Sequence, residues 1–303
     1  YGSFYLDKVV QEEKPDIYIA SQDIWGLDFA INKKWFNEIT SVIWTTLDSL
    51  PLLPTALEAA KKLDNYWIYS SFAVKEFHKQ GFNQVKTFHG PIDDNVFYKL
   101  PNEERLNLRR KFNIPADSFV TGFVFRNQLR KSVPNLLEGY SLWKKENPTV
   151  KNSYLLLHTN FFEGWNIPQL CSEYDISNLE ILTTYICSAC AYYDIRQFSG
   201  KNMQCPACHD KESFNTVSVE TGITEKELNE VYNLMDVYCH PFTSGGQEIP
   251  IQEAKLTELI TLVTNYSCGQ EMCEPSAASL PLEWSEYREQ GTQFRKASTD
   301  PKS

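Results

Sequence analysis

The sequence predicts an α/β protein with two doubly wound domains, each a parallel sheet covered by helices on both faces. Short apolar runs alternate with amphipathic stretches through most of the 303 residues, and such alternation is typical of parallel sheets. The alternation stops between Gly90 and Asn113, which separates two alternating halves. Hydrophobic residues make up 42% of the chain and aromatic residues 14%, enough for two sizeable cores.

In the first half, predicted to form a domain over residues 1–112, apolar runs and helical periodicity alternate. Helices are expected where apolar residues recur every three to four positions, and strands where short β-branched or aromatic runs lie between turn residues. The predicted strands are 16–20, 38–45, 66–70 and 85–88, and the predicted helices are 55–62 and 72–80.

The second half, predicted as a domain over residues 113–303, repeats this alternation. Leu136, Tyr140 and Trp143 fall on one face of a helix, which is typical of a helix packed on a sheet. The predicted strands are 118–125, 154–158, 179–184, 236–240 and 260–264, and the predicted helices are 134–146, 225–234 and 250–259.

The formal net charge of -10 disfavours nucleic acid or an anionic membrane surface as the main partner, because both require a basic face. No uninterrupted apolar run approaches the roughly 20 residues of a membrane-spanning helix, and the N-terminus lacks a signal-peptide pattern. We therefore expect a cytoplasmic protein without a membrane span.

Four of the eight cysteines form two close pairs, Cys187-Ser-Ala-Cys190 and Cys205-Pro-Ala-Cys208, with 14 residues between the pairs. Two such pairs on a hairpin can place four thiolates tetrahedrally, which predicts a structural zinc ribbon inserted at residues 185–212. Two disulfides or a redox-active pair are the alternatives; a reducing cytosol disfavours the former, and the latter would need its own strand and helix.

A glycine loop follows the predicted strand 236–240 and precedes a helix that begins near Pro250. Uncovered backbone N–H groups and the positive end of the helix dipole then converge on one spot, where a phosphate could bind. Arg126 and Lys131, at the carboxyl end of strand 118–125, could hold a diphosphate in the cleft between the domains. A plain strand-to-helix turn and solvated surface cations are the alternatives.

Together, these segments resemble nucleotide-sugar-dependent glycosyltransferases with the two-domain, Rossmann-like GT-B fold, particularly the retaining family 4, or group 1, enzymes. The stretch Phe88-His-Gly-Pro-Ile-Asp93 is similar to the His-Gly-Val-Asp turn of that family, and Phe125–Lys131 to its diphosphate-gripping loop. The matching blocks, in order, are 70–77 with 88–93, 125–131, 221–238, and 244–253 followed by 265–269.

The resemblance implies a donor linked to UDP, GDP or ADP, and an acceptor that is a glycan, a lipid or a protein. It places Glu253 on the ribose hydroxyls and the cations on the diphosphate, so that no catalytic metal is expected. The candidate catalytic residues are Glu248 and Asp48, and the candidate binding residues are Arg126, Lys131, Gly245, Gly246, Gln247 and Glu253.

Two departures weaken the catalytic part of this expectation. Gly245 stands where the family has the first of two spaced glutamates, and Thr46-Leu47-Asp48 stands where it has a His-Asp pair. The alternative is a catalytically silent nucleotide-sugar-binding or scaffold protein with a zinc-ribbon interaction module; a zinc-ribbon nucleic-acid protein is disfavoured by the acidic charge. The resemblance also implies truncation at both ends, an incomplete first domain and an exposed sheet edge.

Overall fold

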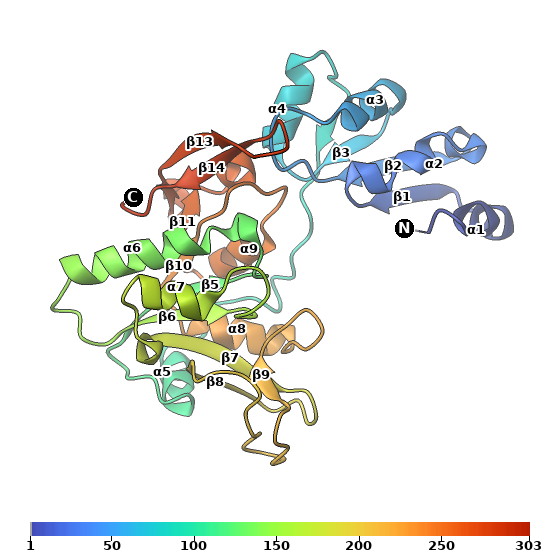
Figure 1. Cartoon of the computed structure of the whole chain (residues 1–303). Coiled ribbons are helices and arrows are strands. Elements are labelled where there is room, and N and C mark those ends of the chain that lie inside the picture. The colour runs from blue at the N-terminus through green and yellow to red at the C-terminus, as the bar shows by residue number, and fades with distance from the viewer. Residues whose placement is uncertain (1) are drawn as a thin grey trace.

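The computed structural model describes residues 2–303, which form two α/β units joined by an extended segment (Figure 1). The first unit has a four-stranded sheet in the order β1-β2-β3-β4, with every pair parallel. Its strands are β1 (Ile17–Ser21), β2 (Thr40–Thr45), β3 (Tyr66–Ile68) and β4 (Lys86–Thr87). Its helices are α1 (Leu6–Glu13), α2 (Asp28–Ile31), α3 (Pro54–Lys62) and α4 (Ser71–Lys79).

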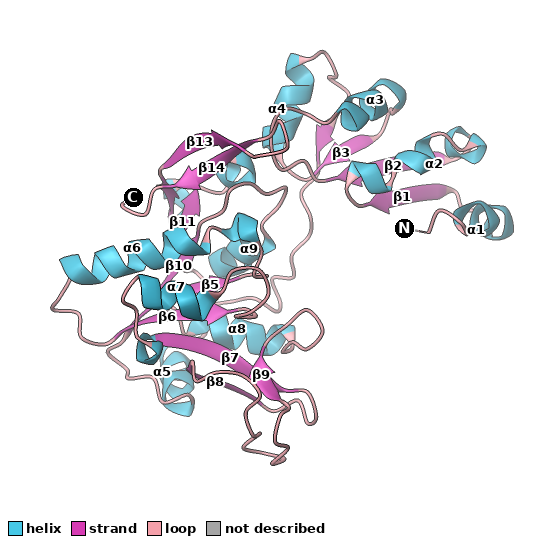
Figure 2. Ribbon diagram, in the orientation of Figure 1, coloured by secondary structure: helices cyan, strands magenta, loops and turns pink. Residues whose placement is uncertain are grey.

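The second unit has an eight-stranded sheet in the order β12-β11-β10-β5-β6-β7-β8, with β9 also paired to β7 (Figure 2). The neighbours from β12 to β7 are parallel, whereas β8 and β9 run antiparallel to β7. The strands are β5 (Phe119–Val124), β6 (Ser153–His158), β7 (Ile181–Cys187), β8 (Tyr193–Gln197), β9 (Phe214–Thr216), β10 (Val237–His240), β11 (Ile260–Thr264) and β12 (Ser279–Leu282). The helices are α5 (Asn102–Lys111), α6 (Val133–Glu146), α7 (Ile167–Glu173), α8 (Glu225–Asn233) and α9 (Ile249–Leu256), and β13 (Trp284–Arg288) pairs with β14 (Arg295–Thr299).

The predicted fold class, two α/β domains with parallel sheets, is confirmed. Each predicted strand and helix has a counterpart at nearly the same residues, although the helix predicted at 250–259 ends at Leu256. The predicted ribbon, residues 185–212, contains the end of β7 and all of β8. In the part of the chain that the structure describes, no helix is both long and apolar enough to cross a bilayer.

Helix α5, placed by its sequence at the end of the first domain, packs with the second. Phe97, Phe112 and Ile114 on either side of it join the core of the second sheet. Arg109 is buried and donates to Leu234 O at 3.1 Å and to Asp236 Oδ2 at 2.8 Å, so it covers the carbonyl end of α8. The two cores therefore divide before α5, not at the predicted 112/113 boundary.

The two units contact each other directly. The Phe72 and Tyr266 rings meet edge to face at 5.5 Å, and Arg295 N donates to Leu50 O at 2.7 Å. Ser71 N, at the first residue of α4, donates to the Glu271 carboxylate at 3.1 Å, where the helix dipole favours an anion. Parts of the second unit thus complete the packing of the first.

The edge strand β1 leaves apolar side chains in contact with solvent. Ile17 and Ile19 are each 57% exposed, and β1 pairs on one side only within the described residues. Strand β1 is thus an edge strand of the first sheet that carries exposed apolar side chains.

Candidate nucleotide-binding site

The candidate site lies at the carboxyl ends of the parallel strands of the second sheet. Strands β10, β5, β6 and β7 are parallel neighbours, so the residues that follow them share one edge. Ligands of open α/β sheets bind at this edge. The glycine loop 241–248 follows β10, and Arg126 and Lys131 follow β5.

A buried ion cluster occupies the centre of this edge. The Glu248 carboxylate accepts from Lys131 Nζ and from Arg130 Nη1, the latter at 2.5 Å, and its Oε2 lies 3.2 Å from His240 Nε2. The side chains of Glu248 and Lys131 are 3% and 4% exposed. Buried charges are stable only when paired, and here one carboxylate pairs with two cations.

The cluster fixes the charge states of its members. Burial alone would raise the pKa of Glu248, but Lys131, His240 and Arg130 outweigh it, so that this pKa lies well below its ordinary value. Burial and the neighbouring Lys131 lower the pKa of His240 to about 4. At neutral pH the carboxylate is therefore ionised and the imidazole neutral, while burial lowers the pKa of Lys131 against the opposing charge of Glu248.

Close packing explains both glycines of the loop. A Cβ on Gly246 would lie 2.4 Å from Thr46 Cβ and 2.8 Å from Asp48 Oδ1, so the loop touches the first domain here. A Cβ on Gly245 would lie 2.4 Å from Glu248 Oε1. The Glu248 carboxylate thus fills the space that a side chain at position 245 would need.

The other loop residues connect the two domains. Gln247 Oε1 accepts from Gly90 N at 3.1 Å, and Gln247 Nε2 donates to Gly90 O at 3.3 Å.

Asp48 lines a cavity of about 200 Å³ with Lys296 and Trp25. Burial raises the pKa of Asp48, with the charge of Glu248 adding to it and Arg130 opposing.

Arg126 lies at the rim of a second cavity, of about 220 Å³. Its side chain is 54% exposed, and its Nη2 donates to Glu163 Oε1 at 2.6 Å. The Thr159 hydroxyl is buried and has no hydrogen-bond partner among residues 2–303. The cavity is lined by Phe125, Arg126, His158, Thr159, Asn160, Glu163, Val217, Ser218, Val219, Gly222, Ile223 and Leu228.

Glu253 lies one turn and a half along α9 from Glu248. Its Oε2 accepts from the Tyr232 hydroxyl at 2.5 Å. Burial raises the pKa of Glu253, and the bond from Tyr232 opposes this. The structure thus does not join Glu253, Arg126 and Lys131 by direct contact: the two cations follow β5, and Glu253 lies on α9.

The four paired cysteines converge beyond the end of β7. The Sγ atoms of Cys187, Cys190, Cys205 and Cys208 all lie within 4.8 Å of one another. Both pairs have the same backbone geometry: Cys187 N donates to Tyr192 O and Ala191 N to Cys187 O, while Cys205 N donates to Asp210 O and His209 N to Cys205 O. His209 is exposed and lies outside the cluster.

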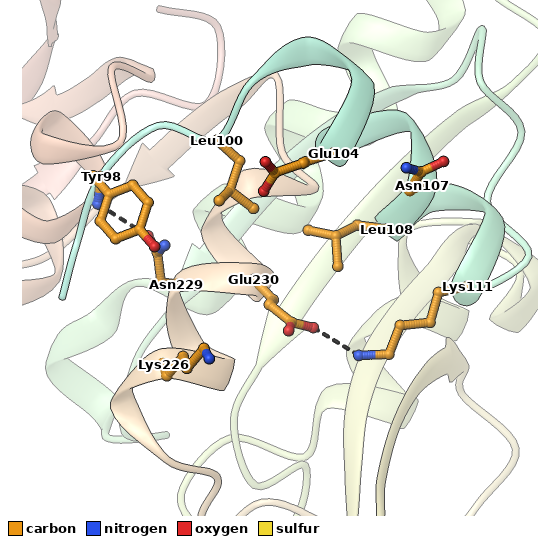
Figure 3. Close-up of a pocket in the computed structure, with 9 residues that line it drawn as sticks. All are labelled: Tyr98, Leu100, Glu104, Asn107, Leu108, Lys111, Lys226, Asn229 and Glu230. Carbon is orange, nitrogen blue, oxygen red and sulfur yellow. Dashed lines mark hydrogen bonds and ion pairs between the residues drawn. The ribbon is translucent and has the colours of Figure 1, made fainter.

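A further depression of about 590 Å³ lies between α5 and α8 (Figure 3). Lys111 Nζ and Glu230 Oε2 pair across it at 2.8 Å, and the Asn229 side chain accepts from Tyr98 N at 3.2 Å. Because these groups satisfy one another, the depression is the seam where α5 docks on α8 rather than a convergent ligand site.

Several residues of the site were not predicted from the sequence. Arg130 stands beside the predicted Lys131, and His240 ends a predicted strand directly before Pro241, so both could have been found from position. Lys296 Nζ donates to Ser244 Oγ at 2.7 Å from β14. Neither Lys296 nor Thr159 has a sequence pattern that marks it.

No protein-family model matches the chain, and no curated protein matches its sequence. Solved structures do match. The chain aligns with a glycosyltransferase of Rickettsia africae at 13% identity and TM-score 0.61, covering 93% of this chain and 66% of that one. A sucrose-phosphate synthase of Thermosynechococcus elongatus aligns at 13% identity and TM-score 0.63, covering 92% and 63%.

The third structure is Anabaena HepE in complex with UDP and glucose, at 16% identity and TM-score 0.62, covering 90% of this chain and 66% of that one. The chain therefore spans a little under two thirds of the length of each of these structures. It has their fold, two Rossmann-like α/β domains of the GT-B type, with a four-cysteine cluster at the edge of the second.

Proposed function

We propose that the chain belongs to a glycosyltransferase that transfers a sugar, with retention, from a nucleoside-diphosphate donor to an acceptor. The observation that carries the proposal is the set of three cations that follow β5, Arg126, Arg130 and Lys131, beside a glycine loop that leads into α9. Two of them contact the same buried carboxylate, and the third lies at the rim of a mainly apolar cavity of about 220 Å³. One of the structures sharing this fold contains UDP.

In this proposal the base enters the 220 Å³ cavity, which is smaller than the roughly 300 Å³ at which drug-sized pockets begin. The unpartnered Thr159 hydroxyl supports this, because a buried polar group without a partner costs free energy that a bound base would recover. Glu253 then accepts from the ribose hydroxyls, Gly245, Gly246 and Gln247 line the donor, and Arg126 and Lys131 hold the diphosphate.

The chemistry would rely on charge stabilisation. The cations offset negative charge that develops on the leaving nucleoside diphosphate, so the step needs no catalytic metal. Glu248 is held firmly in its ionised form, so it would not donate a proton. Its negative charge would instead stabilise positive charge that develops on the sugar ring. Asp48, with its raised pKa, is the candidate to exchange a proton with the acceptor.

A second function is favoured by one observation. The Glu248 carboxylate already occupies Lys131, so the diphosphate must add to or displace an internal anion. A catalytically silent nucleotide-sugar-binding or scaffold protein would tolerate this arrangement.

Binding and turnover distinguish the two functions. We expect UDP, GDP or ADP to raise the melting temperature of the protein by mass action, and one matching nucleotide sugar to be hydrolysed or transferred in a panel of candidate acceptors. Binding without turnover would support the scaffold function. Failure of all three nucleotides to bind would refute both.

We also propose that the four cysteines hold a structural zinc ion. With Zn–S bonds of about 2.3 Å, a tetrahedral site has S–S edges of about 3.8 Å. The Sγ atoms of Cys187 and Cys208 are 3.6 Å apart and those of Cys190 and Cys205 are 3.7 Å apart, far longer than the roughly 2 Å of a disulfide. Four protein ligands leave no open position, and free thiolates fit the cytoplasm that we assign to the protein.

A further inference from the structure

We infer that the zinc ribbon is a brace for the proposed base cavity, so that metal at the four cysteines controls nucleotide affinity. The identity of the ligand rests on the proposed function, whereas the link between zinc binding and the position of the cavity wall does not. The first observation is the position of the ribbon relative to the cavity. Strand β7 is parallel to β6 and ends at Cys187, so the ribbon leaves the sheet at the same edge as the cavity.

The chain that returns from the ribbon forms one wall of the cavity. Strand β9 begins at Phe214, six residues after Cys208, and the next residues, Val217 to Ile223, include five that line the cavity. Cys187 itself is the register partner of Phe214, and its Sγ lies 3.0 Å from Ser213 Oγ. The zinc ligand Cys187 therefore pairs with the strand whose next residue after its end, Val217, begins the wall.

The wall is joined to the opposite side of the cavity through β7. Val217 N donates to Thr184 O at 3.3 Å, and the Thr184 hydroxyl is hydrogen-bonded to His158 Nδ1 at 2.9 Å. His158 lines the cavity from the end of β6. Displacement of β9 from β7 would thus move Val217 away from His158.

The outgoing arm of the ribbon supports a third side. After Cys190 the chain forms β8, and Phe198 at its end stacks on Phe161 at 4.4 Å with an interplanar angle of 11°. Phe161 directly follows Thr159 and Asn160 of the cavity. Near the start of β8, the Tyr193 hydroxyl donates to Glu230 Oε2 at 2.6 Å, which ties this arm to α8.

Packing and pairing hold part of the ribbon, because Ile195 and Phe214 are buried in the core and β8 pairs with β7. Strand β9, however, has only three residues, which pair with the end of β7 and, at Phe214, with Met203. Metal binding can supply further support, because structural zinc sites contribute folding free energy directly. Without zinc, the cavity wall would have its nucleotide-binding conformation in only a fraction of the molecules. The apparent Kd for nucleotide would rise in inverse proportion to that fraction.

The test uses Cys190→Ser and Cys208→Ser, because both side chains are exposed and their replacement leaves no buried cavity. Zinc content, amide hydrogen exchange and the Kd for UDP, GDP and ADP are measured together. The matched control is Ser188→Ala, an exposed position between two of the ligands that supplies no thiolate. As a further control, zinc is removed from the wild-type protein with a chelator and then added back. This separates the effect of zinc loss from a folding defect caused by the substitutions.

We expect one zinc per wild-type and Ser188→Ala chain and none in the cysteine variants. Loss of zinc should speed exchange of amides 214–223 by about tenfold or more, with strand β2 unchanged, and weaken nucleotide binding by about tenfold. Restored zinc should reverse both effects. Unchanged exchange at 214–223 in zinc-free protein would overturn the brace, as would unchanged Kd; zinc-dependent protection without any nucleotide binding would instead refute the proposed function.

Discussion

The carboxylate of Glu248 accepts a hydrogen bond from the ammonium group of Lys131, and both side chains are buried between β5, β10 and α9. Lys131 is one of the two cations predicted to hold a diphosphate. The protein thus places an internal anion where an external one is expected. Arg130 and His240 complete the arrangement, so that removal of the carboxylate would leave buried positive charge without a partner.

Glu248→Gln should therefore separate stability from binding. Loss of the anion leaves Lys131 and Arg130 unpaired, and we expect the free energy of unfolding to fall by about 3 kcal/mol. The vacated positive charge should bind UDP about tenfold more tightly, while turnover of the donor sugar is lost. Urea unfolding and calorimetric titration measure the two effects. Glu163→Gln, at the other cation Arg126, is the control and should change stability by less than about 1 kcal/mol. Weaker UDP binding by Glu248→Gln would show that the carboxylate does not compete with the diphosphate.

Arg126→Ala should affect binding and leave the fold intact. Its ion pair with Glu163 is exposed, and such pairs contribute about 0–1 kcal/mol, so the melting temperature should hardly move. Loss of a charge-assisted bond to the diphosphate should raise the Kd for UDP about tenfold. The control is Lys8→Ala on α1, which removes another exposed cation of an exposed ion pair, far along the chain. If the two variants bind UDP alike, Arg126 does not contact the nucleotide.

Glu253→Gln should reduce discrimination between ribose and deoxyribose. A carboxylate that accepts from ribose hydroxyls gains about 1.5–3 kcal/mol, so the wild-type protein should bind UDP about tenfold more tightly than 2′-deoxy-UDP. In the variant this ratio should approach one, mainly through weaker UDP binding. Competition titrations of the two nucleotides provide the measurement. An unchanged ratio would mean that Glu253 has a structural role, as the hydrogen-bond partner of Tyr232, and does not contact the ribose.

Acidification should destabilise the protein through His158. Burial lowers the pKa of His158 from 6.5 to about 4. Between these pH values the unfolded chain takes up a proton that the folded chain does not, so this contribution is complete above pH 6.5 and is lost as the pH falls toward 4. The full effect is up to about 3 kcal/mol.

His158→Asn removes this proton uptake but can retain the bond to Thr184. The slope of unfolding free energy against pH should therefore be shallower in the variant across that window, as measured by urea titrations at a series of pH values. Equal slopes would mean that His158 is protonated in the folded protein as readily as in the unfolded one.

Local pattern was sufficient for most of the fold. Apolar periodicity located the four strands of the first sheet and five of the eight strands of the second, because a buried parallel strand and its covering helix impose their spacing on neighbouring residues. The sequence placed α5 in the first domain, because nothing local shows that Arg105 and Arg109 bond the carbonyl groups at the end of α8. The elements that were not predicted are short; they are the strands β8, β9, β12, β13 and β14 and the helices α1, α2 and α7.

By itself, the sequence determined the alternating fold and the four zinc-ligand candidates, since both follow from spacing along the chain. It also marked the glycine loop and two cations. Only the tertiary structure decided what these residues do to one another: Lys131 and Glu248 are 117 positions apart, and their pairing depends on two strands lying side by side. The same holds for Gly246 against Thr46 and for the Thr159 hydroxyl without a partner, because packing and hydrogen-bond satisfaction are properties of contacts, not of sequence order.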